Sequence, residues 1–213
     1  IEYCCHRVFA LYRRYDEYAD QQARREWREL LPVPRDRFGV GVLGLGVLGS
    51  AIAGTLSGFG YRVRGFARTR HELAGVETFA GDGQWPQFLG GCQVLIVVAP
   101  LTPQTQNLLD RRSLSMLPRG AHLINVARGG LIVDQDLLAL LDEGHLGGAT
   151  LDVFRTEPLP ADHRFWSHPR IRITPHIAAV TLVEEAASQV ARQIDQLERG
   201  ERPTGLVDRQ RGY

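Results

Sequence analysis

Three polar side chains closely follow three apolar, strand-like segments of the sequence. They are Arg128, Glu157 and His176. Because ligands of open α/β sheets bind at the carboxyl ends of the strands, we expect the three side chains to share one edge of a sheet. Arginine binds carboxylates and polarised carbonyl groups, histidine exchanges protons near neutral pH, and a glutamate beside a histidine favours the imidazolium and holds its ring. The trio therefore suits the delivery of a proton to the carbonyl oxygen of a 2-oxo acid.

Taken singly, each of these residues has a simpler explanation. A strand-end arginine is more often a surface ion-pair residue, a Glu-Pro pair is often only a turn, and a lone histidine is usually structural. Together, at neighbouring strand ends, they indicate catalysis. The remaining histidines show no such placement and are expected to be structural: His6, His71, His122, His145, His163 and His168. No Cys/His spacing indicates a metal site.

A glycine-rich turn joins the first predicted strand to the helix behind it. Gly44, Gly46 and Gly49 form the pattern G-x-G-x-x-G at this junction. The first glycine permits the tight turn, the second lets a pyrophosphate approach the backbone, and the third lets the helix lie close to the strand. Free N–H groups and the positive end of the helix dipole then face the phosphates, so Val47 and Leu48 join the predicted cofactor-binding residues.

The end of the second predicted strand indicates which dinucleotide binds. Sites for NAD usually carry an acidic residue there, which bonds the ribose hydroxyls. This sequence has Arg68, Thr69 and Arg70 instead. Two guanidinium groups and a hydroxyl suit a 2′-phosphate, although a solvated basic loop would look the same. We therefore predict NADP(H) as the cofactor and leave NAD(H) open as a second one.

The composition narrows the class of protein. With 213 residues, 44% of them hydrophobic, and a net charge of +1, the chain has an ordinary globular composition, and no charge excess favours nucleic acid or a membrane. All 25 basic residues are arginine, which excludes chemistry that needs a lysine, such as a Schiff base. Three cysteines, two of them adjacent, form a poor disulfide framework and indicate a reducing compartment, the cytoplasm. We expect no transmembrane helix and no signal peptide.

Strand-like and helical segments alternate along the chain. After the first strand, further strands are predicted at residues 61–66, 94–99, 121–126, 148–153 and 171–174. Helices are predicted at residues 1–31, which Pro32 and Pro34 end, and at 47–58, 85–89, up to 117, 134–142 and about 181–199. This alternation predicts an α/β fold, a doubly wound parallel sheet of the Rossmann type.

Three parts of the chain are expected from this pattern. Residues 1–35 form an N-terminal helical segment that packs on its own domain or on a partner subunit. Residues 36–180 form the NAD(P)-binding Rossmann domain, and residues 181–213 form a C-terminal helix and tail.

Several of these segments together resemble the D-isomer-specific 2-hydroxyacid dehydrogenases, and more closely their glyoxylate/hydroxypyruvate reductase A branch. The matching stretches are residues 44–49, 67–70, 100–103, 125–130, 151–154, 157–159, 174–176 and 207–213. The resemblance implies that Arg128 binds the carboxylate and carbonyl of the substrate, that His176 is the acid/base and that Glu157 is its partner. It adds further cofactor-binding residues: Pro100, Thr102, Val126, Ala127, Arg128 and, near the nicotinamide carboxamide, Asp152. It also implies a homodimer with the first helix near the interface.

The resemblance further implies a second domain, built largely from residues before the position of Ile1, that closes over the cofactor and grips the substrate carboxylate. We expect the chain to lack that domain and to keep NADPH binding better than turnover. The expected activity is NADPH-dependent reduction of small 2-oxo acids, glyoxylate or hydroxypyruvate, with histidine as proton donor. Two alternatives stay open: a dehydrogenase of this family for another 2-hydroxy acid, and a non-catalytic NAD(P)-binding interaction protein.

Overall fold

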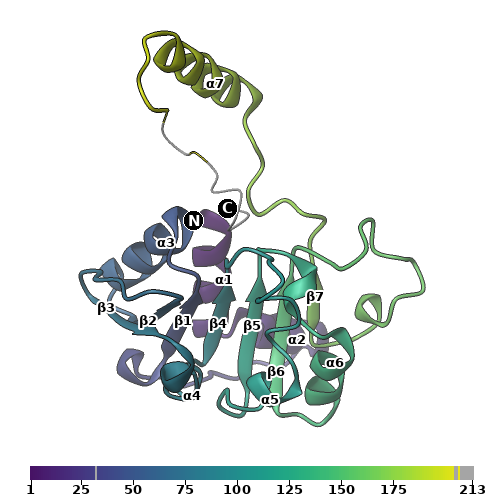
Figure 1. Ribbon diagram of the computed structural model, residues 1–213. Helices are drawn as coiled ribbons and strands as arrows, with labels where there is room; N and C mark the ends of the chain where they lie inside the picture. Colours follow the sequence, from purple (N-terminus) through teal and green to yellow (C-terminus); the bar gives the residue numbers. More distant parts are fainter. Residues whose placement is uncertain (32, 204–205, 207–213) are drawn as a thin grey trace. The chain divides into compact units, whose positions relative to one another are not determined.

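The computed structural model describes residues 1–31, 33–203 and 206, and these residues contain one seven-stranded parallel sheet (Figure 1). Its order is β3-β2-β1-β4-β5-β6-β7. The strands are β1 (Gly39–Leu43), β2 (Arg62–Ala67), β3 (Val76–Ala80), β4 (Val94–Val97), β5 (Ala121–Asn125), β6 (Leu146–Leu151) and β7 (Ile171–Ile173). The order reverses between β1 and β4, and doubly wound sheets bind their ligands at the carboxyl ends of the strands beside such a reversal. The predicted fold class is confirmed.

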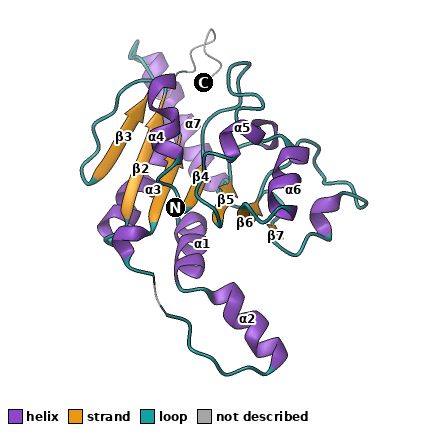
Figure 2. Ribbon diagram, turned by 90° about the horizontal axis from the view of Figure 1, so that it is seen from below, coloured by secondary structure: helices purple, strands orange, loops and turns teal. Residues whose placement is uncertain are grey.

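Helices cover both faces of this sheet. One apolar cluster joins the sheet to α4 (Trp85–Leu89), α5 (Arg111–Leu114) and α6 (Asp134–Asp142). A second cluster joins the sheet to α1 (Glu2–Tyr12) and α3 (Val47–Gly58). Figure 2 shows α1 on the side opposite α5 and α6. Because both faces are covered, β1, β4 and β5 are buried along their whole length, which explains why β1 and β4 contain no polar side chain.

The N-terminal region differs from the single helix predicted for residues 1–31. The helix α1 ends at Tyr12, and α2 (Tyr15–Arg24) begins after Arg14, whose backbone is left-handed with φ 58°. Residues 25–31, which follow α2, are not helical. The single long helix was predicted because the apolar pattern continues along the sequence. Packing does not support it, because only Gln21 of α2 is buried. Pro32 lies outside the described residues.

Two other elements also differ from the prediction. The strand β3, which was not predicted, pairs with β2 and places Phe79 beside Phe66. Phe79 is its only buried residue, as is usual for a short strand at the edge of a sheet. The helical stretch expected to reach residue 117 is only one turn, α5, where the N–H of Ser113 donates to the Asp110 carboxylate at 2.8 Å.

The chain divides into two compact units, Ile1–His176 and Ile177–Tyr213. The second unit contains α7 (Val183–Glu198), which begins and ends close to the predicted limits. Its larger apolar side chains are exposed: Val183, Val190, Ile194 and Leu197. Within the described part of the chain, no helix has the length and apolar character that crossing a membrane requires. The matching stretch 207–213 lies outside the described residues.

A buried polar cluster ties α1 to the middle of the sheet. The ring of His122 on β5 bonds the hydroxyl of Thr150 on β6 at 3.0 Å, and Nε of Arg7 donates to the same hydroxyl at 3.2 Å. Arg7 also pairs with Asp16 at 3.1 Å. Burial, reinforced by the charge of Arg7, lowers the pKa of His122 to about 3. The ring is therefore neutral in the folded protein at neutral pH.

We predict that His122 makes the fold sensitive to mild acid. An unfolded histidine takes up a proton near its ordinary pKa of 6.5, whereas the folded one does so only near about 3. The unfolded state thus binds more protons between these values, so stability falls as the pH falls through that window, by at most about 1.4 kcal/mol per unit. Urea unfolding of His122→Gln and of the unchanged chain between pH 6.5 and 4.5 measures the difference. Equal slopes would contradict the prediction.

Candidate active site

The glycine turn has the shape that a dinucleotide site needs. Gly44 has φ +104°, and a Cβ atom there would lie 2.8 Å from the backbone of Ala99 after β4. A Cβ atom on Gly49 would lie 1.8 Å from the carbonyl oxygen of Gly44, so α3 can approach β1 only without a side chain. At Gly46, by contrast, a Cβ atom would meet open space. The turn is therefore closed on its inner side and open where phosphates would approach.

The start of α3 offers donors to that open space. Gly46 is the N-cap residue, and no described side chain caps the helix. The first N–H groups of a helix have no partner within it, and they lie at the positive end of its dipole. The side chains of Val47 and Leu48 are exposed beside them. These residues fit the pyrophosphate of a dinucleotide.

The other predicted cofactor residues lie on loops at the same edge of the sheet. Arg68, Thr69 and Arg70 are exposed and follow β2, which lies beside β1. Pro100 and Thr102 follow β4, the other neighbour of β1. Thr105, which the sequence did not single out, fastens this loop because its hydroxyl donates to the carbonyl oxygen of Pro100 at 2.7 Å.

Arg128 stands on a turn that is fixed from below. Asn125, fully buried at the end of β5, accepts a hydrogen bond from the N–H of Ala127 at 3.1 Å and donates to the carbonyl oxygen of Arg128 at 3.0 Å. Val126 also lies within this turn, half-buried. The arginine side chain is exposed, with one guanidinium nitrogen 2.6 Å from the carbonyl oxygen of Ala127. A single buried amide therefore sets the direction of Arg128.

The structure brings Glu157 and His176 into contact. Nδ1 of His176 lies 2.7 Å from one carboxylate oxygen of Glu157, and the other oxygen accepts the N–H of Phe154 at 2.8 Å. His176 has a left-handed backbone with φ 57°, and its N–H donates to the carbonyl oxygen of Asp152 at 2.9 Å. His176 is therefore held both through its ring and through its backbone N–H.

The charges around Glu157 keep it ionised. Partial burial raises the pKa of this carboxyl group, but the hydrogen bonds from His176 and from the N–H of Phe154, with the charges of His176 and Arg128, outweigh burial. The pKa of Glu157 therefore lies below its usual range. Arg128 contributes the smallest of these effects on Glu157, through its charge.

Asp152 lies beneath this edge and is almost completely buried. Its carboxylate accepts the hydroxyl of Thr174 at 2.5 Å, and the Thr174 oxygen is 2.7 Å from the hydroxyl of Tyr3. Burial raises the pKa of Tyr3, so its hydroxyl keeps the proton that it donates to Thr174. Sequence reasoning missed Tyr3 because it lies 171 positions from Thr174 and no local pattern connects them.

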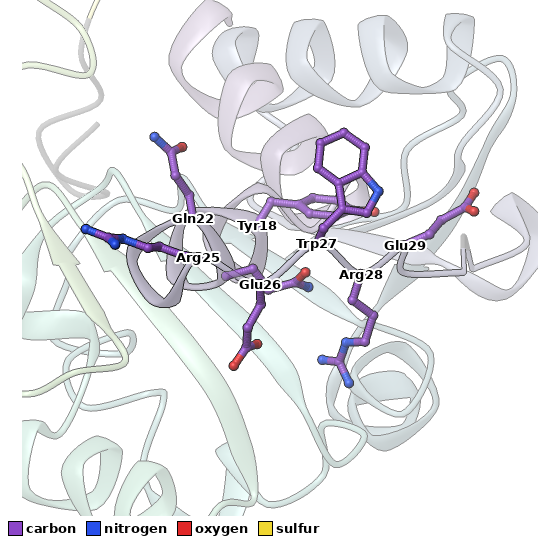
Figure 3. Close-up of a pocket in the computed structure, with 8 residues that line it drawn as sticks. Tyr18, Gln22, Arg25, Glu26, Trp27, Arg28 and Glu29 are labelled. Carbon is purple, nitrogen blue, oxygen red and sulfur yellow. The ribbon is translucent and has the colours of Figure 1, made fainter.

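A separate pocket of about 700 Å³ lies at the end of α2 (Figure 3). Its lining comes entirely from the local segment Tyr18, Gln21, Gln22, Arg25, Glu26, Trp27, Arg28 and Glu29. Trp27 is fully exposed there. None of the residues predicted for cofactor or substrate belongs to this pocket.

Comparison with known proteins identifies the class of this fold and site. Residues 5–178 match the family described as D-isomer specific 2-hydroxyacid dehydrogenase, NAD binding domain. A glyoxylate/hydroxypyruvate reductase A of Yersinia enterocolitica is 48% identical over 212 residues, which are 100% of this chain and 68% of that protein. Its counterpart in Serratia proteamaculans is equally similar.

Solved structures agree with this match. A D-isomer specific 2-hydroxyacid dehydrogenase from Xanthobacter autotrophicus, in complex with NADPH and MES, is 40% identical with a TM-score of 0.93, over 97% of this chain and 85% of that one. An NADPH-dependent glyoxylate/hydroxypyruvate reductase from Sinorhizobium meliloti, in complex with NADP and sulfate, is 35% identical with a TM-score of 0.96, over 100% of this chain and 68% of that one.

The chain belongs to the D-isomer specific 2-hydroxyacid dehydrogenase family. It is the cofactor-binding domain of an NAD(P)-dependent enzyme, and its relatives are of the glyoxylate/hydroxypyruvate reductase A type. The family and the cofactor class predicted from the sequence are confirmed.

The contrast between Gly46 and Gly49 gives a testable prediction. Gly46→Ala places a methyl group in open space, so we expect an unchanged unfolding free energy but a dissociation constant for NADPH at least about tenfold higher, because the methyl obstructs the phosphates. Gly49→Ala drives a methyl into the Gly44 carbonyl and should destabilise the fold by about 1–3 kcal/mol or more.

Urea unfolding and NADPH fluorescence measure the two effects. Gly54→Ala is the matched control, because it adds a methyl to the same helix with nothing within 4 Å. Loss of stability in Gly46→Ala, or unchanged NADPH binding, would contradict the assignment of its open side to the phosphates.

Proposed function

We propose that this protein reduces small 2-oxo acids, glyoxylate or hydroxypyruvate, to 2-hydroxy acids with NADPH. The observation that carries the proposal is the contact of 2.7 Å between Glu157 and His176, on the sheet edge that also carries the glycine turn. Arg128 stands on the strand end next to theirs. Relatives with the name glyoxylate/hydroxypyruvate reductase A support the substrate class.

Each residue of the trio has one task in this reaction. Arg128 binds the carboxylate of the substrate and polarises its carbonyl group. His176 is held at Nδ1 by Glu157, so Nε2 delivers the proton to the carbonyl oxygen. Glu157 stays ionised because its pKa is low, and it balances the imidazolium before the proton leaves. Reduced nicotinamide, when bound, supplies the hydride for the carbonyl carbon.

We assign the cofactor residues in three groups. Gly44, Gly46, Val47, Leu48 and Gly49 bind the pyrophosphate, while Arg68, Thr69 and Arg70 bind the 2′-phosphate that distinguishes NADPH. The strand-end residues surround the nicotinamide half: Pro100, Thr102, Val126, Ala127, Arg128 and Asp152. NADP in two structures of relatives supports the preference.

The same proposal covers the assembly and the parts of the chain. We infer a homodimer, supported by the fully exposed Trp27, which lines the pocket of Figure 3, and by the exposed side chain of Leu31. Residues 36–180 bind the cofactor, residues 1–35 pack on the sheet and on the partner subunit, and residues 181–213 form a separate helix and tail. Three free thiols, Cys4, Cys5 and Cys92, support a cytoplasmic location.

Replacing the histidine tests the reaction. In the full-length gene product, His176→Asn should lower kcat for glyoxylate by about 100- to 10 000-fold, because the proton donor is lost. The dissociation constant for NADPH should not change. Loss of NADPH absorbance measures turnover, and His6→Asn, an exposed histidine of α1, is the matched control. Undiminished turnover in His176→Asn would refute the role of this residue. Absence of turnover in the unchanged protein, with NADPH bound, would favour the interaction-protein alternative.

Replacing the two arginines tests the cofactor preference. The double variant Arg68→Ala, Arg70→Ala should weaken NADPH binding at least about tenfold, because charge-assisted hydrogen bonds to the 2′-phosphate are lost. NADH, which has no such phosphate, should bind as before. Fluorescence titration with both cofactors measures the ratio, with Arg112→Ala, Arg119→Ala as a control that removes the same charge elsewhere. An equal loss for NADPH and NADH would rule out a 2′-phosphate site.

A further inference from the structure

The turn that carries Arg128 and the loop that carries Glu157 touch backbone to backbone. A Cβ atom on Gly129 would lie 2.0 Å from the carbonyl carbon of Phe154 and 2.3 Å from the backbone nitrogen of Arg155. No side chain fits between the two segments at this point. The relative position of Arg128 and Glu157 therefore depends on how firmly these two loops are pressed together.

The side chain of Arg155 reaches across this contact to three partners in two other segments. Its guanidinium donates to the side-chain oxygen of Asn107 at 2.5 Å and to the carbonyl oxygen of Ile132, and it pairs with Asp134 at 3.4 Å. Ile132 directly follows the short 3-10 helix Gly129–Leu131, and Asp134 begins α6. Only about a third of the Arg155 side chain is exposed.

The partners of Arg155 are themselves fixed. Asn107 has a left-handed backbone with φ 58°, and its N–H donates to the carbonyl oxygen of Gly130 at 2.9 Å. Asp134 is also near His163, at 3.8 Å. Arg155 therefore fastens its own loop to the turn that follows Arg128.

We propose that Arg155 is a positioning residue that sets the spacing between Arg128 and the pair formed by Glu157 and His176. Its role in turnover rests on the proposed function; its role in geometry does not. The N–H of Phe154, next to Arg155, is the donor that holds one oxygen of Glu157. Releasing Arg155 frees that peptide, then the carboxylate, and then the ring of His176.

This position depends on the planar geometry of the arginine guanidinium group. A guanidinium group presents several donors in fixed directions and can serve Asn107, Ile132 and Asp134 at once. The ammonium group of a lysine is a point charge and can bond well to only one of these three partners. Arg155→Lys should therefore behave more like Arg155→Met than like the unchanged protein.

The first test reads the geometry without turnover. In the 213-residue chain, carboxyl ¹³C NMR follows the titration of Glu157, which faces His176, Arg128 and the N–H of Phe154. In Arg155→Met, the pKa of Glu157 should rise toward its ordinary value, as those contacts loosen. Arg164→Met is the matched control. Arg164 lies in the loop before β7 and makes an exposed ion pair with Asp142 at the end of α6. An unchanged pKa of Glu157 in Arg155→Met would overturn the proposal.

A second variant guards against misfolding. Asn107→Gly removes one partner of Arg155 but keeps the left-handed backbone available. It should move the pKa of Glu157 in the same direction by a smaller amount. The double variant Asn107→Gly, Arg155→Met should show no shift beyond that of Arg155→Met alone. Additive shifts would mean that the two residues act separately.

The last test uses the full-length gene product. Arg155→Met should lower kcat for glyoxylate about tenfold with the NADPH dissociation constant unchanged, since a small misplacement of reacting groups is costly. The acid limb of its pH–rate profile should begin at higher pH, because Glu157 now takes up a proton earlier. Normal kcat and profile would overturn a role for Arg155 in turnover. An inactive unchanged protein would instead count against the proposed function, and the NMR result would still decide the geometry.

Discussion

The edge of the sheet proposed to bind the cofactor depends on one close approach, between the start of α3 and the end of β1. Gly49 lacks a side chain, and so α3 lies against the carbonyl of Gly44 and points its first N–H groups beyond the strand ends. Leu45, between them, is buried in the space that Gly65 on β2 leaves open. The turn is thus anchored in the core by one side chain while its outer surface stays available to phosphates.

The side chains proposed to be reactive, Arg128, Glu157 and His176, are exposed, and the backbone beneath them keeps them ordered. Asn125 holds the turn of Arg128, the N–H of Phe154 holds Glu157, and the carbonyl of Asp152 holds the backbone of His176. Because solvent screens the exposed pair of Glu157 and His176, we assign its value to orientation rather than to stability. The left-handed backbone of His176 costs free energy locally. The hydrogen bond from its N–H to the carbonyl oxygen of Asp152 offsets that cost.

The sequence was informative where structure is local. The helices α3, α4 and α6 lie where the pattern placed them, and the contact of Glu157 with His176 followed from their places after neighbouring strands. The edge strand β3 could not be predicted because pairing on one side requires little apolar alternation. The contacts of Tyr3 and Arg155 join distant segments, and no spacing in the sequence reveals such pairs.

The segment before β1 helps to hold the residues of the candidate site in place. On α1, Tyr3 bonds Thr174, which bonds Asp152, and Arg7 bonds Thr150. These partners lie at or just beyond β6 and β7, the two strands that precede Glu157 and His176. Cys4, Cys5 and Val8 of the same helix are buried in the cluster that also holds β1 and α3. A single helix therefore packs beneath the glycine turn and fixes the ends of the strands that position Glu157 and His176, so the proposed cofactor half and the proposed proton-transfer half of the edge share one support.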